Sequence, residues 1–442
     1  MKKRVLIFGG GIAGLTAAVH LVRTGFEVTL LEKHPYAGGR TYSFRKPFWP
    51  FPIDNGPHVM LGAYSALLEL LRLTGGARFL GGEKGLRVPY RGAAGKRAEL
   101  RAAGLPPPLH LAVGLWRFPL LDRRAKWAIL RAFLQVRRLP DSPGLDAKSA
   151  GDWLCETGQT GPAREMFWRP LVLATLNAEP EQVSFLQLLR VLKLGFLAGK
   201  SESRILTLPE GLTPTLISPA LDWLEKRGAA IRYREGVRRL HFRDGHVAAV
   251  ETARESYRDF AAVVSAVPPH VLADILRNSG ERAEETARRL QFAVQPILNL
   301  HFWWREPLLA EPFAALLGGR GQWLFRGKSV SGLTHYTVVV SGAAALLEER
   351  REVLVQQLLA ELEKIFPGFE GKGVLHRYLV VEKRATVLCS PGTEERRPPP
   401  GRLLGNLFVA GDWTRTGLPP TMESAARSGT AVAEEIASLH PH

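Results

Sequence analysis

Residues 4–14 read RVLIFGGGIAG, and this stretch decides the fold. Residues 4–8 end in a run of apolar side chains, which is typical of a buried strand. A helical pattern over residues 12–24 begins directly after the cluster of glycines. A strand, a glycine turn and a helix in immediate succession open a dinucleotide-binding βαβ unit. The N-terminus therefore predicts a Rossmann-like α/β domain.

The glycines occupy the three fixed positions of the G-x-G-x-x-G pattern. Gly9 permits the tight turn, Gly11 lets a pyrophosphate approach the backbone, and Gly14 allows the helix to pack closely. The helix then starts at Ile12 and Ala13, whose backbone amides can bind phosphate oxygens. The alternative, a tight turn that binds no ligand, is disfavoured by the strand and the acid that follow.

The next strand, over residues 28–32, ends in an acidic side chain. The spacing from Gly9 to Glu32 is close to the roughly 20 residues expected for a carboxylate that binds the adenosine ribose. We therefore predict that Glu32 accepts hydrogen bonds from the ribose hydroxyls and that its neighbour Lys33 also contacts the cofactor.

Gly38, Gly39 and Arg40 follow, and they favour a flavin over a nicotinamide dinucleotide. A plain NAD domain has no need of an arginine at this place. An arginine after two flexible glycines can lie along a pyrophosphate or a flavin edge, because its fixed fork of donors suits phosphate. A basic loop after a turn remains the alternative.

The stretch LEKHPYAGGRTYSF, residues 31–44, resembles the flavin-containing amine oxidase and phytoene desaturase superfamily. Members of that superfamily continue with an Asp-x-Gly element beside the flavin, and this chain continues with Ile53-Asp54-Asn55-Gly56-Pro57-His58. The resemblance implies FAD as the cofactor, with Asn55, Gly56 and His58 as flavin neighbours. A solvated loop histidine is the alternative for His58.

The C-terminal stretch NLFVAGDWTRTGLPPTMESAARSG, residues 406–429, resembles the second half of the same signature. Residues 407–410 predict a buried strand, Gly411 allows close approach, and the carboxylate of Asp412 suits a ribityl hydroxyl of FAD. A helix predicted from Thr421 and Met422 would direct its N-terminal amides at the flavin and stabilise negative charge on it.

The resemblance implies a mixed α/β (α+β) fold in which the FAD-binding domain is discontinuous. We expect an amine-oxidase-like arrangement, with a substrate domain of antiparallel sheet and helices interleaved between segments of the FAD-binding domain. The expected FAD-binding segments are 1–75, 202–288 and 385–442, and the expected substrate-binding segments are 76–201 and 289–384. Asp244 and Gly245 predict a hairpin turn in the second FAD segment. The resemblance makes Val237 the adenine contact through its backbone, and a valine of the sheet core is the alternative.

Within the superfamily the chain resembles the hydroxysqualene dehydroxylase family over nearly its whole length. The segments FWRPLVLATLNAEPEQVS (167–184) and VVEKRATVLCSPGTEERRP (380–398) carry this likeness together with the two flavin motifs. It implies reduction of an apolar isoprenoid alcohol, hydroxysqualene, to squalene by hydride from reduced FAD. His58 is then the candidate catalytic acid, and either NADPH or a separate carrier supplies the electrons. Two alternatives stay open: a desaturase or amine oxidase that runs the flavin oxidatively, and a non-catalytic flavin-binding membrane protein.

Charge and cysteine content limit the partners and the compartment. Lys and Arg number 59 against 42 Asp and Glu, a net charge of +17 that favours a polyanionic partner. The chain lacks zinc-finger spacing, an RNP-like motif and a concentrated basic tail, so nucleic acid is not expected and an anionic membrane surface is. Cys155 and Cys389 form no CxxC pair, so neither a disulfide framework nor a metal site is predicted. A cytoplasmic protein, peripheral at the inner face of the cell membrane, is expected.

The region 105–140 is the predicted membrane contact. On a helical wheel Leu121, Ala125, Ile129, Ala132, Phe133 and Val136 share one face, while Trp127, Leu130 and Leu134 form a second stripe flanked by Arg123, Arg124, Arg131, Arg137 and Arg138. The second stripe predicts insertion into a lipid interface, with the arginines on anionic headgroups. A helix buried between two parts of its own domain is the alternative. The basic start Met1-Lys2-Lys3-Arg4 is not expected to be a signal peptide, because glycines interrupt the apolar run that follows.

Overall fold

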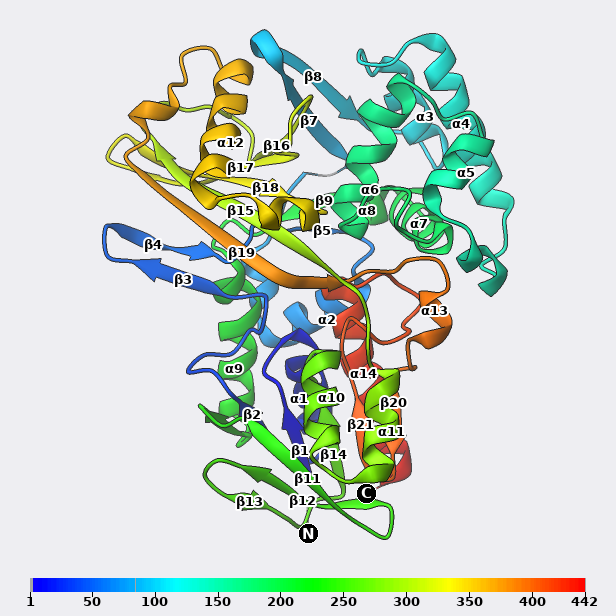
Figure 1. Cartoon of the computed structure of the whole chain (residues 1–442), viewed down its shortest axis with the longest axis vertical. Helices are drawn as coiled ribbons and strands as arrows, with labels where there is room; N and C mark the ends of the chain where they lie inside the picture. The colour runs from blue at the N-terminus through cyan, green and yellow to red at the C-terminus, as the bar shows by residue number, and fades with distance from the viewer. Residues whose placement is uncertain (1–2, 84, 442) are drawn as a thin grey trace.

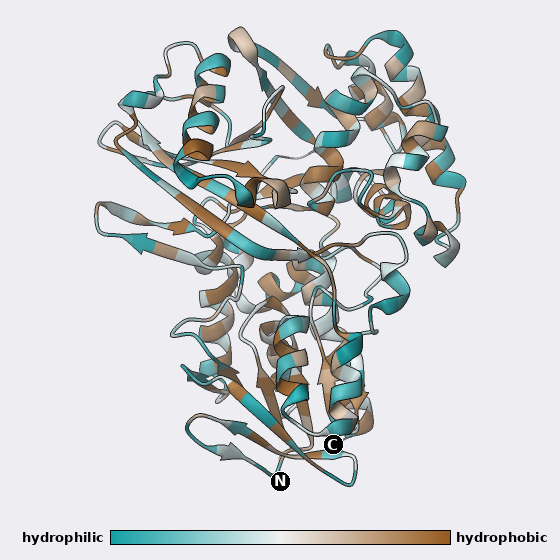
Figure 2. Ribbon diagram, in the orientation of Figure 1, coloured by the Kyte–Doolittle hydropathy of each residue, from teal (hydrophilic) through white to brown (hydrophobic). Residues whose placement is uncertain are grey.

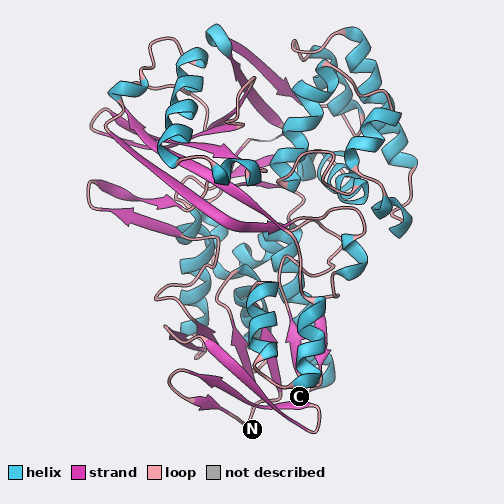
Figure 3. Ribbon diagram, viewed as in Figure 1, coloured by secondary structure: helices cyan, strands magenta, loops and turns pink. Residues whose placement is uncertain are grey.

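The computed structural model describes residues 3–83 and 85–441 of the chain. Two parts lie one above the other in Figure 1, a lower part built on a parallel sheet and an upper part with a second sheet beside a group of helices. Figure 3 shows strands and helices mixed in both parts, which confirms the expected α/β fold class. Met1 and Lys2 of the basic start lie outside the described residues.

Within the described residues the lower part contains a six-stranded sheet in the order β10-β2-β1-β14-β21-β20. Its strands are β10 (Ala230–Tyr233), β2 (Glu27–Glu32), β1 (Arg4–Phe8), β14 (Ala262–Ser265), β21 (Leu407–Val409) and β20 (Gly401–Leu404). The first five are parallel, and β20 runs antiparallel to β21. The sheet therefore joins the beginning, the middle and the end of the chain.

Both faces of this sheet are covered, because its central strands are apolar on both sides. In β1, Val5 and Ile7 face one core and Leu6 and Phe8 face the other. The first core contains the helices α1 (Ile12–Arg23), α2 (Ser65–Thr74), α9 (Ser218–Glu225) and α14 (Met422–Leu439). The second contains α10 (Pro269–Arg277), α11 (Glu281–Arg289) and the small sheet β11 (Val237–Arg243), β12 (His246–Thr252) and β13 (Ser256–Tyr257). Figure 2 shows the apolar central strands between these layers.

The upper part contains, among the described residues, a seven-stranded sheet in the order β19-β15-β18-β17-β16-β7-β8. Its strands are β19 (His376–Val387), β15 (Val294–Trp304), β18 (Leu333–Val340), β17 (Trp323–Val330), β16 (Phe313–Leu316), β7 (Arg87–Gly92) and β8 (Lys96–Arg101). The helix α12 (Arg351–Ile365) packs on this sheet. The long strands β15 and β19 descend toward the lower part in Figure 1. Since β19 ends at Val387, one strand crosses the expected boundary at 385, and the exact domain limits stay a prediction.

Helices α3 (Leu109–Arg117), α4 (Arg123–Arg138), α5 (Ala150–Glu156), α6 (Arg169–Leu176), α7 (Phe185–Leu192) and α8 (Lys200–Ser203) form the helical group beside this sheet. The prediction that Leu121 shares a helical face with the residues from Ala125 to Val136 was wrong for Leu121. Leu121 is buried but lies in the link between α3 and α4, and α3 ends at the extended Phe118, where the following Pro119 disfavours helix. Asp122 then caps α4 by accepting a hydrogen bond from the amide of Ala125 at 2.7 Å.

Candidate functional site

A cavity of about 1160 Å³ extends from the carboxyl ends of the parallel strands into the upper part. Every residue expected to bind the cofactor lines it except Gly14. The carboxyl edge of a parallel sheet is where such folds bind ligands, because neighbouring loops diverge there. Three segments that are distant in the sequence therefore share one cavity.

The N-terminus of α1 forms one wall of the cavity and is open to a phosphate. Gly11 is its N-cap, and in the described chain no side chain caps it and no acid lies in its first turn. Gly9 has a φ of +107°, which favours glycine. A Cβ on Gly14 would lie 2.0 Å from the carbonyl oxygen of Gly9, so Gly14 brings the helix against the turn instead of lining the cavity. These backbone amides and the helix dipole fit the pyrophosphate of FAD.

Glu32 is buried at the end of β2 and is held by backbone amides. Its Oε2 accepts a hydrogen bond from Gly10 and its Oε1 accepts one from His34, both at 2.8 Å. A carboxylate has about four acceptor sites, so further ones remain for ribose hydroxyls. Lys33 and Val237 line the same end of the cavity. The free acceptor sites of Glu32 at this end suit the ribose of a dinucleotide.

Arg40 connects three distant segments at the middle of the cavity. Its Nη2 lies 2.6 Å from Oδ1 of Asp412, and its Nη1 donates to the carbonyl oxygen of Ala385. The sequence predicted separate cofactor contacts for Arg40 and Asp412, and the ion pair between them was not foreseen. The pair holds both side chains at the point where a pyrophosphate and a ribityl chain would pass.

Asn299, which the sequence reasoning missed, supports the loop expected beside the flavin. Its Nδ2 donates to the carbonyl oxygen of Asn55 at 3.1 Å. A Cβ on Gly56 would lie 2.7 Å from the same Nδ2, so a larger residue there would push the Asn299 amide away from this loop. The available signal was a polar amide flanked by the apolar side chains of Leu298 and Leu300 in strand β15. Asp54 points elsewhere, because its Oδ1 accepts hydrogen bonds from Ser43 and from the amide of Leu212.

His58 faces the cavity with its ring, and its surroundings determine the tautomer and the protonation state of the ring. Its Nδ1 is 2.7 Å from the carbonyl oxygen of Gly56. Only a protonated Nδ1 can make this hydrogen bond, so the neutral ring has an acceptor at Nε2. The position of the ring inside the cavity, away from bulk water, lowers the pKa of His58, with Arg40 as a smaller cause. The neutral ring therefore predominates at pH 7 and accepts a proton, and the imidazolium form is needed to donate one.

The N-terminus of α14 also faces the cavity, through Thr421 and Met422. Thr421 caps the helix by accepting a hydrogen bond from the amide of Ser424 at 3.2 Å. The acid in this first turn, Glu423, is turned away and accepts hydrogen bonds from the amides of Ala66 and Leu67 at the start of α2. The positive end of the α14 dipole is thus left for negative charge in the cavity.

Beyond the polar groups the cavity continues as an apolar passage through the upper part. Leu115, Phe133, Phe167, Phe196, Trp323 and Phe325 are among the side chains that line it. Trp323 and Phe325 belong to this lining, whereas Trp303 is fully buried in a core. The passage reaches the surface at Leu109, Trp127 and Leu134, which are exposed and also line it. A long apolar molecule fits such a passage.

Within residues 3–83 and 85–441 no group of three or more His, Cys, Asp or Glu side chains is placed to hold a metal ion. Among the helices described, none has the length and apolar character needed to cross a membrane.

Residues from both ends of the chain form one dinucleotide site, and an apolar passage leads to the position expected for the flavin. Together these features define an FAD-dependent oxidoreductase. The family model for flavin-containing amine oxidoreductases matches residues 12–437. The chain belongs to this family.

Several proteins are similar to this chain over nearly its full length. The chain is 31% identical to a hydroxysqualene dehydroxylase of Rhodopseudomonas palustris, over 99% of both chains. It is 30% identical to a second, from Sinorhizobium fredii, over 98% of both. A 15-cis-phytoene desaturase of Glycine max is 23% identical over 98% of this chain and 79% of that protein.

Solved structures share the fold. A redesigned putrescine oxidase superposes with a TM-score of 0.75 at 17% identity and covers 99% of both chains. Cyclohexylamine oxidase from Brevibacterium oxydans gives 0.73 at 18% identity over 100% of both. At this level of identity the likeness concerns the fold alone.

Proposed function

We propose that this enzyme reduces hydroxysqualene to squalene. The observation that carries the proposal is the continuity of the apolar passage with the dinucleotide cradle. An isoprenoid chain in this passage would place its allylic carbon at the flavin end and leave its tail among aromatic and leucine side chains. The full-length relatives named hydroxysqualene dehydroxylase support this substrate.

When bound, reduced FAD would supply the hydride that replaces the hydroxyl on its carbon, and the hydroxyl would leave with a proton as water. The apolar walls exclude solvent that would recapture an allylic cation. His58 in its imidazolium form would donate the proton from Nε2, while Gly56 holds Nδ1. The N-terminus of α14 would stabilise negative charge on the flavin in the adjoining part of the cavity. NADPH or a separate carrier would restore the electrons.

We expect squalene as the product when enzyme whose FAD has been chemically reduced is mixed with hydroxysqualene under anaerobic conditions. The absorbance of oxidised flavin should return in proportion to the squalene formed, measured by gas chromatography. The control is the same enzyme with oxidised FAD, which should form no squalene. A flavin that stays reduced in the presence of hydroxysqualene would contradict the proposed function.

The oxidative alternative is a desaturase-like reaction, and it is favoured by the desaturases among the relatives. It makes the opposite prediction, because oxidised FAD would then be bleached by a polyene precursor. The same anaerobic spectra therefore distinguish the two directions of flavin chemistry.

We also propose that the enzyme docks on an anionic membrane at the opening of the apolar passage. The first stripe of α4 is buried, whereas Trp127 and Leu134 of the second are 58% and 50% exposed. Trp116 of α3, 45% exposed, packs against Trp127 with the ring centroids 5.9 Å apart. Exposed arginines flank this apolar surface: Arg117, Arg123, Arg124, Arg131, Arg137 and Arg138. An apolar surface ringed by cations fits a lipid interface.

The paired change Trp127→Gln and Leu134→Gln should weaken sedimentation with liposomes that contain phosphatidylserine. The expected loss is about tenfold, because two apolar side chains no longer enter the lipid. Wild-type binding should also fall in high salt. The control is Leu375→Gln, which changes a leucine that is 50% exposed outside α3 and α4. Equal sedimentation of all three proteins would argue against docking at this surface.

A further inference from the structure

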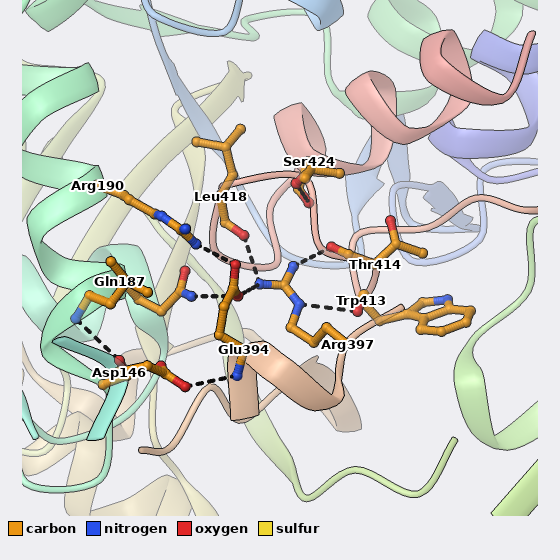
Figure 4. A network of polar contacts seen from close by, with 12 residues as sticks. Asp146, Gln187, Arg190, Glu394, Arg397, Trp413, Thr414, Leu418 and Ser424 are labelled. Carbon is orange, nitrogen blue, oxygen red and sulfur yellow. Dashed lines mark hydrogen bonds and ion pairs between the residues drawn. The ribbon is translucent and has the colours of Figure 1, made fainter. Parts of the chain in front are cut away.

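Arg397 is a fully buried arginine directly after the short helix α13 (Thr393–Arg396), outside the cavity lining. Its side chain is 0% exposed, and it lies at the centre of the polar network in Figure 4. A buried cation is costly unless hydrogen bonds and an opposite charge compensate it. The contacts that compensate this buried charge therefore indicate what Arg397 does.

All five N–H donors of the Arg397 guanidinium have an acceptor. One Nη1 hydrogen bond goes to the Glu394 carboxylate at 3.0 Å. The other four go to backbone carbonyl oxygens of Asp412, Trp413, Thr414 and Leu418. A lysine has three donors and no planar fork, so it could not reproduce this set. Arg397 thus fixes the path of the loop from Asp412 to Leu418.

This loop includes a candidate flavin contact. The Asp412 side chain lines the cavity and pairs with Arg40, while its carbonyl oxygen accepts hydrogen bonds from Arg397 at 3.1 Å and from Ser424 of α14 at 3.1 Å. The backbone that carries the carboxylate is therefore held by two residues that do not line the cavity. A shift of this loop would move Asp412 and disturb the N-terminus of α14 together.

Glu394 extends the network into the helical group. Its Oε1 is 2.5 Å from Nη1 of Arg190 on α7, and its Oε2 accepts a hydrogen bond from Gln187 at 2.9 Å. Its own amide donates to Oδ2 of Asp146 at 3.0 Å. One buried carboxylate thus lies between two arginines, Arg397, which holds the loop after β21, and Arg190, which belongs to α7 of the helical group (Figure 4).

We propose that Arg397 is a positioning residue for bound FAD, and that Glu394 couples the packing of α7 to the same loop. Arg397 acts through Asp412 and α14 and does not touch the cofactor. The inference depends on FAD as the cofactor and is independent of the substrate proposed above.

The test is Arg397→Lys, purified as apo protein and titrated with FAD. We expect the dissociation constant for FAD to rise about tenfold or more, because several hydrogen bonds to a buried cation are lost and the loop is released. The visible circular dichroism of the residual bound flavin should change, since its surroundings shift. The thermal midpoint of the apo protein should fall as well.

Arg91→Lys is the matched control for loss of a buried arginine. Arg91 is 7% exposed, pairs with Glu311 at 2.6 Å and donates to the carbonyl oxygen of Tyr90, all in the upper part. This variant should lower the thermal midpoint and leave the FAD dissociation constant and flavin spectrum unchanged. If Arg397→Lys behaves in the same way, Arg397 is a stability residue only and the proposal is overturned.

Glu394→Gln tests the coupling between α7 and the loop. If Arg397→Lys does not fold, this variant also tests whether the network around Arg397 positions FAD. Glutamine keeps an acceptor for Arg397 but removes the charge between the two arginines. We expect weaker FAD binding, by about threefold to tenfold, and an altered flavin spectrum. FAD binding and spectrum identical to wild type would refute the proposed coupling. Neither outcome depends on turnover, so failure of the hydroxysqualene assay would not be mistaken for failure here.

Discussion

Gly11→Ala should yield a normally folded apo protein that binds FAD at least about tenfold more weakly, because a methyl group would block the approach of the pyrophosphate to the backbone. The substitution is compatible with the protein itself. Gly11 has an extended backbone with a φ of −78°, and the nearest described neighbour of a new Cβ is the carbonyl oxygen of Gly38 at 4.0 Å. Any loss of affinity therefore reports contact with the ligand. FAD titration of the apo protein by flavin fluorescence gives the dissociation constant, and thermal unfolding gives the stability.

Gly14→Ala provides the contrasting control at the same motif. Its Cβ would lie 2.0 Å from the carbonyl oxygen of Gly9, so the helix must move away from the turn. Overpacking of this kind typically costs about 1–3 kcal/mol. This variant should lose stability as apo protein, whereas Gly11→Ala should not. If Gly11→Ala binds FAD as tightly as the wild type, the pyrophosphate does not lie at this helix N-terminus.

Local physics explains why both cofactor motifs could be predicted from the sequence. A glycine turn, a capped helix and a buried strand each depend on residues within about one turn or strand of one another. The strand Arg4–Phe8, the turn at Asp244 and Gly245, and the helix start at Thr421 and Met422 are all as expected. Chemistry that resides in backbone amides, as at Gly11, follows directly from such elements.

Contacts between distant segments could not be predicted in this way. Arg40 and Asp412 were both singled out, yet their pairing joins residues 372 positions apart. Asn299 reaches Asn55 across 244 positions, and nothing in its own strand indicates the partner. Arg397 is one of several arginines in a charged stretch, and its sequence neighbours do not distinguish a buried one from a solvated one. Such contacts depend on how the two sheets are placed against each other.

The region around α3 and α4 shows an intermediate case. The periodicity predicted two apolar stripes on α4, and the structure buries the first and exposes Trp127 and Leu134 of the second. Burial of the second stripe within its own domain was the alternative, and among its three residues it holds for Leu130, which is partly buried against the core of the helical group. Periodicity did not reveal that the exposed stripe borders the opening of the cavity.

His58→Ala should lower turnover by about 10²- to 10⁴-fold while FAD remains bound, because a positioned proton donor or acceptor contributes rate enhancement of this order. Stopped-flow measurement of flavin oxidation by hydroxysqualene gives the rate, and the flavin spectrum gives the occupancy. The matched variant is His58→Asn, whose Nδ2 can still donate to the carbonyl oxygen of Gly56. It should preserve the loop and still lose turnover. Wild-type turnover in both variants would exclude His58 from the reaction.

The pH dependence then identifies the direction in which His58 transfers its proton. The position of the ring inside the cavity, away from bulk water, lowers the pKa of His58 below its ordinary value of 6.5. If His58 donates a proton in the reductive reaction, the rate is highest at low pH and falls as pH rises through that lowered pKa, since the imidazolium form disappears. If His58 instead accepts a proton in an oxidative reaction, the rate rises through the same pKa. In either case this change of the rate with pH should be absent in His58→Asn. A wild-type rate that rises with pH below 6.5 would thus favour the desaturase-like alternative, without any need to identify the natural electron donor.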